Sequence, residues 1–181
     1  MKSIGIIGGM APDSTLLYYR YIIEEYRRRF KDHNYPEIIV YSVNFQKFIN
    51  WMNNNDWKSI ADELVNITCR LKDAGADFAL IATNTMHIVF NEVSVRSPIP
   101  LLSIVEAVGE EAVKNNVRVV GLLGTKFTMT REFYRKGLEK YNIKVVIPDE
   151  DDIQYINQVI FEELTMGVIK EETKRRFIDI A

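Results

Sequence analysis

The feature that most constrains this chain is an apolar run at residues 78–82, which is followed at once by the polar residues 83–85. A short run with no polar interruption is typical of a strand that is covered on both faces of a parallel sheet. Residues 83–85 would then lie at the carboxyl end of that strand, where ligands bind in open α/β sheets. The sequence therefore predicts an α/β fold with a site at this strand end.

A helical pattern resumes at Ile88, so the same polar residues would also precede a helix. Backbone N–H groups and the macrodipole at a helix N-terminus favour a bound carboxylate or phosphate. Threonine and asparagine are also common capping residues, and a plain cap explains the segment equally well. Both interpretations stay open on this stretch alone.

Composition describes an ordinary globular protein of 181 residues, with 47% hydrophobic residues and a net charge of −2. There is no basic stripe to indicate nucleic-acid binding and no apolar run long enough to span a membrane. Residues 1–4 lead directly into a strand rather than into a signal peptide, so we expect a cytoplasmic location.

The single cysteine, Cys69, is expected to be a buried structural thiol, and His33 and His87 are too few for a zinc cluster.

The first expected strand covers residues 3–8 and ends in Gly8 and Gly9, ahead of a helix whose apolar positions follow a 3.6-residue period. Asp13 or Ser14 is expected to cap that helix. The turn lacks the third glycine of a dinucleotide fingerprint and the Gly-Lys-Ser/Thr of a P-loop. The amides of Gly9 and Met10 could still bind a small carboxylate.

Further strands are predicted at residues 37–43 and 101–104, and further helices at residues 57–75 and 105–113. Residues 51–55, which contain Trp51 and Met52, are expected to form a loop. Their aromatic and amide content would suit a lid over a pocket, although a plain surface loop is the commoner case.

The sequence at residues 5–8 recurs in similar form at residues 121–124, and each copy precedes a helix and a strand, here at 130–140 and 144–147. The repeat predicts two pseudo-symmetric α/β lobes, residues 1–98 and 99–181, each a mostly parallel sheet flanked by helices, with a ligand cleft between them. The second lobe lacks a counterpart of the strand at 78–82, and the chain ends within an amphipathic pattern at 171–181. We therefore expect a longer chain whose C-terminal part is missing.

Residues 8–12 (Gly-Gly-Met-Ala-Pro), 82–87 (Ala-Thr-Asn-Thr-Met-His) and 123–125 (Leu-Gly-Thr) together resemble the aspartate/glutamate racemase family, along essentially the whole chain. The resemblance implies an amino-acid racemase that needs neither pyridoxal phosphate (PLP) nor a metal. Members exchange the α-proton of the substrate with one cysteine from each lobe. Inversion needs a base on one face of the α-carbon and an acid on the other, which two lobes can supply.

The chain departs from the family pattern at both cysteines. Thr83 stands where the family has the first cysteine of Cys-Asn-Thr-x-His, and the second, in Gly-Cys-Thr-Glu, would lie beyond Ala181. The chain is similar to a subset with Thr-Asn-Thr-Met-His, whose members favour one enantiomer. A hydroxyl is a far weaker acid than a thiol, so Thr83 is expected to serve one face as the weaker partner. The 181-residue chain alone is expected to be inactive.

The resemblance also implies a set of substrate contacts. We expect the substrate-binding residues to be the amide of Met10 with Asn84 and Thr85 on the α-carboxylate, Gln46 and Met52 near the second strand and the lid, and Thr125 and Thr128 from the second lobe. Lys126 could reach a side-chain carboxylate of the substrate, although a solvated lysine is the commoner case. His87 could orient the carboxylate, but a structural role is expected for it.

Two other functions stay open. A catalytically silent protein that binds acidic amino acids would keep the carboxylate pocket without the proton-transfer pair, and a nucleotide-binding domain is disfavoured by the missing phosphate loop. The first helix carries more apolar surface than one face needs, notably Tyr18, Tyr19, Tyr21 and Tyr26, so a homodimer is expected.

Overall fold

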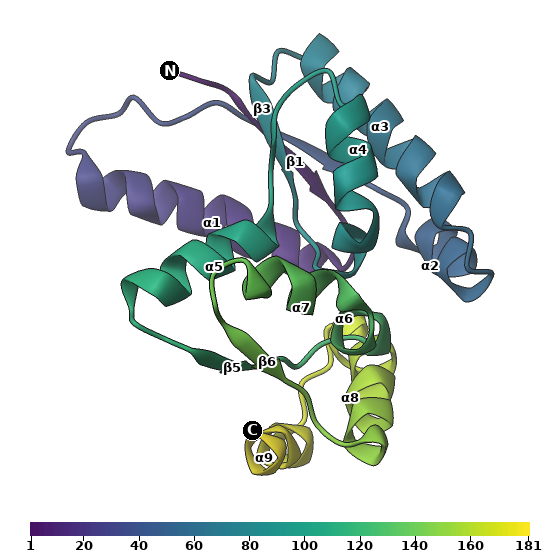
Figure 1. Cartoon of the computed structure of the whole chain (residues 1–181). Helices are drawn as coiled ribbons and strands as arrows, with labels where there is room; N and C mark the ends of the chain where they lie inside the picture. The colour runs from purple at the N-terminus through teal and green to yellow at the C-terminus, as the bar shows by residue number, and fades with distance from the viewer. The chain divides into compact units, whose positions relative to one another are not determined.

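The structure, a computed structural model, describes all 181 residues (Figure 1). The chain divides into two compact units, Met1–Ser103 and Ile104–Ala181. Residues 99–103 belong to the first unit because strand β4 (Leu101–Leu102) pairs with strand β3 (Phe78–Ile81) of that unit. None of the helices combines the length and the apolar content that crossing a membrane requires.

The first unit alternates strands and helices. Its elements in chain order are β1 (Ile4–Gly8), α1 (Pro12–Arg29), β2 (Ile38–Ser42), α2 (Phe45–Asn53), α3 (Trp57–Asp73), β3 (Phe78–Ile81), the 3₁₀ helix η1 (Thr85–Val89), α4 (Phe90–Arg96) and β4 (Leu101–Leu102). The strands expected at 3–8, 37–43, 78–82 and 101–104 are therefore confirmed within two residues of their observed ends.

The four strands form one parallel sheet in the order β2-β1-β3-β4, which confirms the predicted α/β class. Ile7 of β1 is paired with Tyr41 of β2 on one side and with Ile81 of β3 on the other. From β1 the chain moves to β2 on one side of it. From β2 the chain then returns past β1 to β3 on the other side. Because such crossovers are right-handed, α1 covers one face of the sheet while α3 and α4 cover the opposite face (Figure 1).

The centre of the sheet is fully buried, as the apolar runs predict. Ile6, Ile7, Ala79 and Ile81 have no exposed surface. The buried face of α3, which includes Leu64, Ile67 and Leu71, covers one side of this sheet. Gly5 is needed at this contact, because a Cβ there would approach the Cβ of Ala79 to 3.0 Å.

The predicted loop at residues 51–55 is wrong for the first three of these residues. Helix α2 continues to Asn53, and Phe48 and Met52, one helical turn apart, are 1% and 3% exposed. Asn44 caps this helix by accepting a hydrogen bond from the N–H of Gln46. Only Asn54 and Asn55 form the turn, so the segment is no lid.

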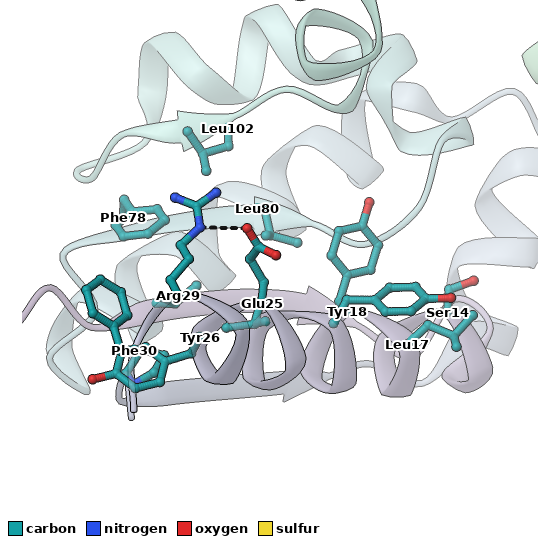
Figure 2. A pocket seen from close by; sticks show the side chains of 14 residues that line it. Ser14, Leu17, Tyr18, Glu25, Tyr26, Arg29, Phe30, Phe78, Leu80 and Leu102 are labelled. Carbon is teal, nitrogen blue, oxygen red and sulfur yellow. Dashed lines mark hydrogen bonds and ion pairs between the residues drawn. The ribbon is translucent and has the colours of Figure 1, made fainter. Parts of the chain in front are cut away.

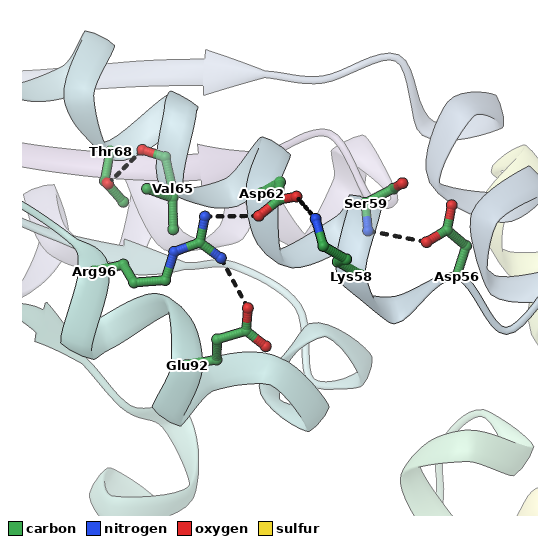
Figure 3. A network of polar contacts seen from close by, with 8 residues as sticks. All are labelled: Asp56, Lys58, Ser59, Asp62, Val65, Thr68, Glu92 and Arg96. Atoms are coloured by element: carbon green, nitrogen blue, oxygen red, sulfur yellow. Dashed lines mark hydrogen bonds and ion pairs between the residues drawn. The ribbon is translucent and has the colours of Figure 1, made fainter.

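Helices α3 and α4 are joined by a cluster of charged side chains at the surface (Figure 3). The Arg96 guanidinium donates to Asp62 on α3 at 2.6 Å and to Glu92 on α4 at 2.8 Å, and Lys58 also pairs with Asp62. These pairs are solvated, so each contributes little to stability. Cys69, on the outward side of α3, is exposed, which corrects the expectation of a buried thiol.

The second unit is a smaller α/β assembly. Its elements are α5 (Ile104–Lys114), β5 (Val119–Gly121), α6 (Lys126–Thr130), α7 (Glu132–Glu139), β6 (Lys144–Val146), α8 (Glu150–Glu162), the 3₁₀ helix η2 (Leu164–Met166) and α9 (Glu171–Ile180). Strands β5 and β6 are parallel, with Val120 opposite Val145. Tyr134, Leu138 and Ile143 form its main core together with Val105 of α5.

The single helix expected at 130–140 is divided in two. Arg131 has extended backbone angles, φ −80° and ψ 146°, and separates α6 from α7. The Thr130 hydroxyl donates to the carbonyl of Lys126 at 2.7 Å, a local bond of the kind that competes with helix continuation.

Candidate functional site

The strand order creates a topological switch point between β1 and β3. Connections leave these neighbouring strands on opposite faces of the sheet, and ligands of open α/β folds bind in the crevice at such strand ends. The N–H of Ala82 donates to the carbonyl of Ile7 at 2.8 Å, so the two strand ends stay paired up to the point where the loops begin. The loop with Met10 and the loop with Thr83, Asn84 and Thr85 therefore start side by side.

The glycine turn after β1 is closely packed rather than open. The N–H of Gly9 donates to the Thr15 hydroxyl at 2.8 Å, and a Cβ on Gly8 would lie 2.3 Å from that same hydroxyl. The Gly9 amide is thus occupied, which corrects its expected role in carboxylate binding. Thr15 on α1 is 7% exposed and was not identified from the sequence.

The start of α1 also differs from expectation. Ala11 occupies the N-cap position without a capping side chain, and Pro12 begins the helix, so neither Asp13 nor Ser14 caps it. Thr15 reaches back to the glycine turn instead. No acceptor within the chain takes the N–H of Met10, which keeps this donor compatible with a ligand carboxylate.

The polar residues after β3 differ in burial. Thr83 is half-buried, Asn84 is exposed and Thr85 is 5% exposed. Asn84 occupies the cap position of η1, but its side chain makes no capping hydrogen bond, which disfavours the plain-cap interpretation for this residue. Because η1 is a 3₁₀ helix of five residues, the dipole expected to attract an anion is weak, and local peptide groups matter more.

His87 holds the end of this loop. Its Nδ1 lies 2.9 Å from the carbonyl oxygen of Thr83, and its ring is stacked on Phe90 with centroids 5.0 Å apart and an interplanar angle of 2°. A carbonyl oxygen can only accept, so Nδ1 carries the proton. Burial lowers the pKa of His87 to about 4, against the opposing effect of the Thr83 hydrogen bond, so the imidazole is neutral near pH 7. The expected structural role of His87 is consistent with these contacts.

The lowered pKa of His87 predicts that stability depends on pH. The unfolded chain binds a proton at an ordinary histidine pKa of about 6.5, whereas the folded chain resists it down to about 4. The contribution is therefore complete above pH 6.5 and is lost as the pH falls toward 4. Between pH 7.5 and 5.0 we expect a loss of about 2 kcal/mol in the free energy of unfolding.

Urea denaturation at the two pH values measures this loss, with His87→Asn as the control. This variant keeps a donor at the equivalent atom but does not titrate, so it should lack the 2 kcal/mol component. Equal pH dependence in the two proteins would contradict the lowered pKa.

Two other expected contacts of the first unit have different surroundings. Gln46 follows β2, at the same sheet edge as Met10 because the N–H of Val43 donates to the carbonyl of Gly8 at 3.0 Å. Gln46 is exposed, and its side-chain amide donates to Asn50 at 2.9 Å. Met52 is 3% exposed and lies on helix α2 rather than in a lid. Its contact with a ligand remains a prediction.

The second unit has a similar polar turn after β5. Thr125 caps α6 by accepting from the N–H of Thr128, and the two hydroxyls are 3.1 Å apart. Thr128 is 2% exposed, so its hydroxyl supports the turn. A Cβ on Gly124 would lie 3.1 Å from the Thr128 side chain, much as Gly8 lies against Thr15 in the first unit.

Lys126 begins α6, and both its backbone N–H and its side chain have partners. Its N–H donates to Asn157 at 2.8 Å and its ammonium pairs with Glu150 at 3.3 Å. The Lys126 side chain is 45% exposed, so the ion pair is consistent with the expected solvated lysine.

The first unit also contains an apolar groove of about 950 Å³ between α1 and the sheet (Figure 2). Leu17, Tyr18, Phe78, Leu80 and Leu102 line it. Its main charged groups are Glu25 and Arg29, which pair with each other at 2.6 Å. The groove offers no free charge to an acidic ligand, and no group of three or more His, Cys, Asp or Glu side chains in the chain is arranged to hold a metal ion.

Comparison with known proteins shows that the chain is similar to amino-acid racemases. The family model Asp/Glu/Hydantoin racemase matches residues 7–181. A broad-specificity amino-acid racemase of Bacillus subtilis is 28% identical over 160 residues, which is 87% of this chain and 69% of that protein.

Two solved structures are similar over nearly all of the chain. A Yersinia pestis protein provisionally assigned as an Asp/Glu racemase has a TM-score of 0.88 and 36% identity, covering 99% of this chain and 79% of that one. An aspartate racemase homologue from Pyrococcus horikoshii has a TM-score of 0.78 and 45% identity, covering 94% and 74%.

Proposed function

Because this chain belongs to the Asp/Glu/Hydantoin racemase family, we propose that it inverts the α-carbon of acidic amino acids, aspartate or glutamate, by proton transfer on both faces. Family membership supports an amino-acid racemase activity. The observation that carries the more specific proposal is the loop at the β1–β3 switch point, where a polar segment centred on Thr83 starts beside the Met10 amide. The mechanism needs no pyridoxal phosphate and no metal.

In this proposal the α-carboxylate is bound at the switch point. The N–H of Met10, which no acceptor within the chain takes, and the polar groups of Asn84 and Thr85 hold it. Holding the carboxylate stabilises the charge that develops when the α-proton leaves. Thr83 then faces the α-carbon and transfers a proton on one side.

The opposite face needs a second acid–base group. We assign it to a cysteine thiol outside residues 1–181, since the single cysteine of the chain, Cys69, is on the exposed side of α3. A thiol is a few per cent ionised near pH 7 and can abstract a proton, whereas a threonine hydroxyl is hardly ionised. The pair is therefore unequal, with the thiol as the better base.

Several parts of the site remain predictions. Gln46, Thr125 and Thr128 are proposed to contact the substrate or to support the groups that do. The homodimer and the cytoplasmic location expected from the sequence also remain predictions.

The test measures α-proton exchange in heavy water with the L- and D-enantiomers of aspartate, glutamate and alanine. The sample is the protein expressed from its natural gene, and its intact mass is measured first. The two enantiomers have equal free energy in solution, so a racemase must have equal kcat/KM in both directions. Exchange without inversion is not bound by this equality. It is therefore the measurement that reveals an unequal pair.

We expect inversion of aspartate or glutamate, little action on alanine, and faster exchange for one enantiomer. Saturable binding of acidic amino acids without any exchange would instead identify a catalytically silent binding protein. That alternative is favoured by one observation, the hydroxyl of Thr83 in place of a thiol. Equal action on alanine would contradict the assignment to acidic substrates.

A further inference from the structure

The hydrogen bond between His87 and Thr83 has a geometric effect beyond satisfying a buried group. In an α-helix the Thr83 carbonyl would accept from the backbone N–H four residues later. Here the N–H of His87 donates to Asn84 at 2.9 Å, in 3₁₀ fashion, and the His87 side chain takes the Thr83 carbonyl instead. One side chain thus replaces a missing backbone bond at the start of η1.

The peptide group between Thr83 and Asn84 is planar and trans, so its C=O and N–H point in opposite directions. With the carbonyl held toward the His87 ring, the N–H of Asn84 points away from it. The same plane sets the backbone angle ψ of Thr83 and so the direction in which its Cα presents the side chain. A single contact therefore governs two groups of the site.

The ring is itself fixed. His87 is 4% exposed and stacked in parallel on Phe90, the first residue of α4. Packing of the ring and donation from Nδ1 together leave the peptide plane little freedom.

We propose that His87 is a positioning residue whose Nδ1–H holds the Thr83–Asn84 peptide in one orientation, aligning the proton-transferring side chain and the neighbouring amide. This inference rests on the proposed function of Thr83. The neutral state of the buried imidazole is consistent with it, because a neutral ring with a proton on Nδ1 donates without adding charge to the site. His87 acts through Thr83 and transfers no proton itself.

A matched pair of variants separates positioning from packing. His87→Asn places an amide nitrogen at the position of Nδ1 but removes the ring, whereas His87→Phe keeps the stacked ring but removes the donor. Positioning predicts that His87→Phe is the damaging change and that His87→Asn is close to wild type. A purely packing role predicts the reverse order.

The first measurement does not depend on catalysis. In ¹⁵N relaxation the order parameter of the Asn84 amide reports on the peptide plane directly. We expect a rigid value of about 0.85 in the wild type and in His87→Asn, and a decrease toward about 0.6 in His87→Phe. A rigid Asn84 amide in His87→Phe would overturn the proposal.

The second measurement is the rate at which the full-length wild type and the two variants invert aspartate or glutamate. We expect His87→Phe to lower the inversion rate about 10-fold or more and His87→Asn to stay within about 3-fold of wild type, because small misplacements of a catalytic group are costly. Equal loss in both variants, or the greater loss in His87→Asn, would overturn the proposal. If the wild type inverts nothing, the proposed function fails, while the order parameter still decides the role of His87.

The wild-type protein offers a test that no folding defect can affect. The ¹⁵N shifts of the His87 ring at pH 7 should show a protonated Nδ1. A proton on Nε2 alone would leave Nδ1 without a hydrogen to donate and would overturn the proposal.

Discussion

Replacing Gly9 with alanine is expected to lower the free energy of unfolding by about 3 kcal/mol or more. Gly9 has φ +88°, a left-handed conformation that costs about 1–2 kcal/mol for a residue with a Cβ. The new methyl group would also lie 2.6 Å from the Ser42 hydroxyl and 2.8 Å from the backbone nitrogen of Val43. Backbone atoms at the end of β2 cannot move aside without disturbing the sheet, so overpacking adds about 1–3 kcal/mol.

Gly75 provides a matched control in the same unit. It has φ +98°, yet no atom lies within 4 Å of the position that a Cβ would occupy. Gly75→Ala should therefore cost only the conformational part, about 1–2 kcal/mol. Urea denaturation of both variants measures the difference, and equal losses would mean that the close approach of Gly9 to Val43 contributes nothing.

The sheet of the first unit could be predicted from the sequence because burial on both faces leaves a direct sequence pattern. Ile6 and Ile7 are adjacent and both fully buried, and the same holds for Ile81 and, almost, for Ala82. Adjacent apolar residues of this kind distinguish a central parallel strand from a half-exposed one. Only the strand ends differ by a residue or two.

The features that the sequence did not predict depend on tertiary contacts. Residues 51–53 carry loop-like asparagine beside Met52, yet the burial of Phe48 and Met52 keeps them helical. Tertiary packing here overrides a local preference for a turn. Cys69 is exposed because it is not among the positions of α3 that face the core. The residue type alone does not indicate which face of the helix it occupies.

The candidate site also contains features that the sequence predicted and features that it did not. The polar segment after β3 was identifiable because a strand end followed by polar residues has a local signature. The role of Thr15 was not identifiable, and the structural role expected for His87 came without its partner. Each depends on a contact with a backbone group, the N–H of Gly9 in one case and the carbonyl of Thr83 in the other. Spacing alone did not distinguish the Gly9 amide, which is occupied, from the Met10 amide beside it.

Substitutions at Thr83 are expected to have the largest effect on activity. Removing the hydroxyl in Thr83→Ala leaves one face of the α-carbon without a proton-transferring group, and such groups contribute about 100-fold to 10,000-fold in rate. Inversion should therefore fall at least about 100-fold. Thr83→Ser keeps the hydroxyl and loses only a methyl group, so it serves as the control and should retain most of the activity.

Thr83→Cys tests the direction of the asymmetry. A thiol has a pKa near 8.5 and supplies a usable base near neutral pH, which a threonine hydroxyl does not. Exchange of the enantiomer whose α-proton faces residue 83 should rise about 10-fold or more relative to exchange of the other, because the weaker base has been replaced by one of ordinary strength. The measurement is the ratio of the two exchange rates in heavy water, compared between wild type and variant. An unchanged ratio would mean that Thr83 does not limit proton transfer on its face, and the unequal pair would have to be abandoned.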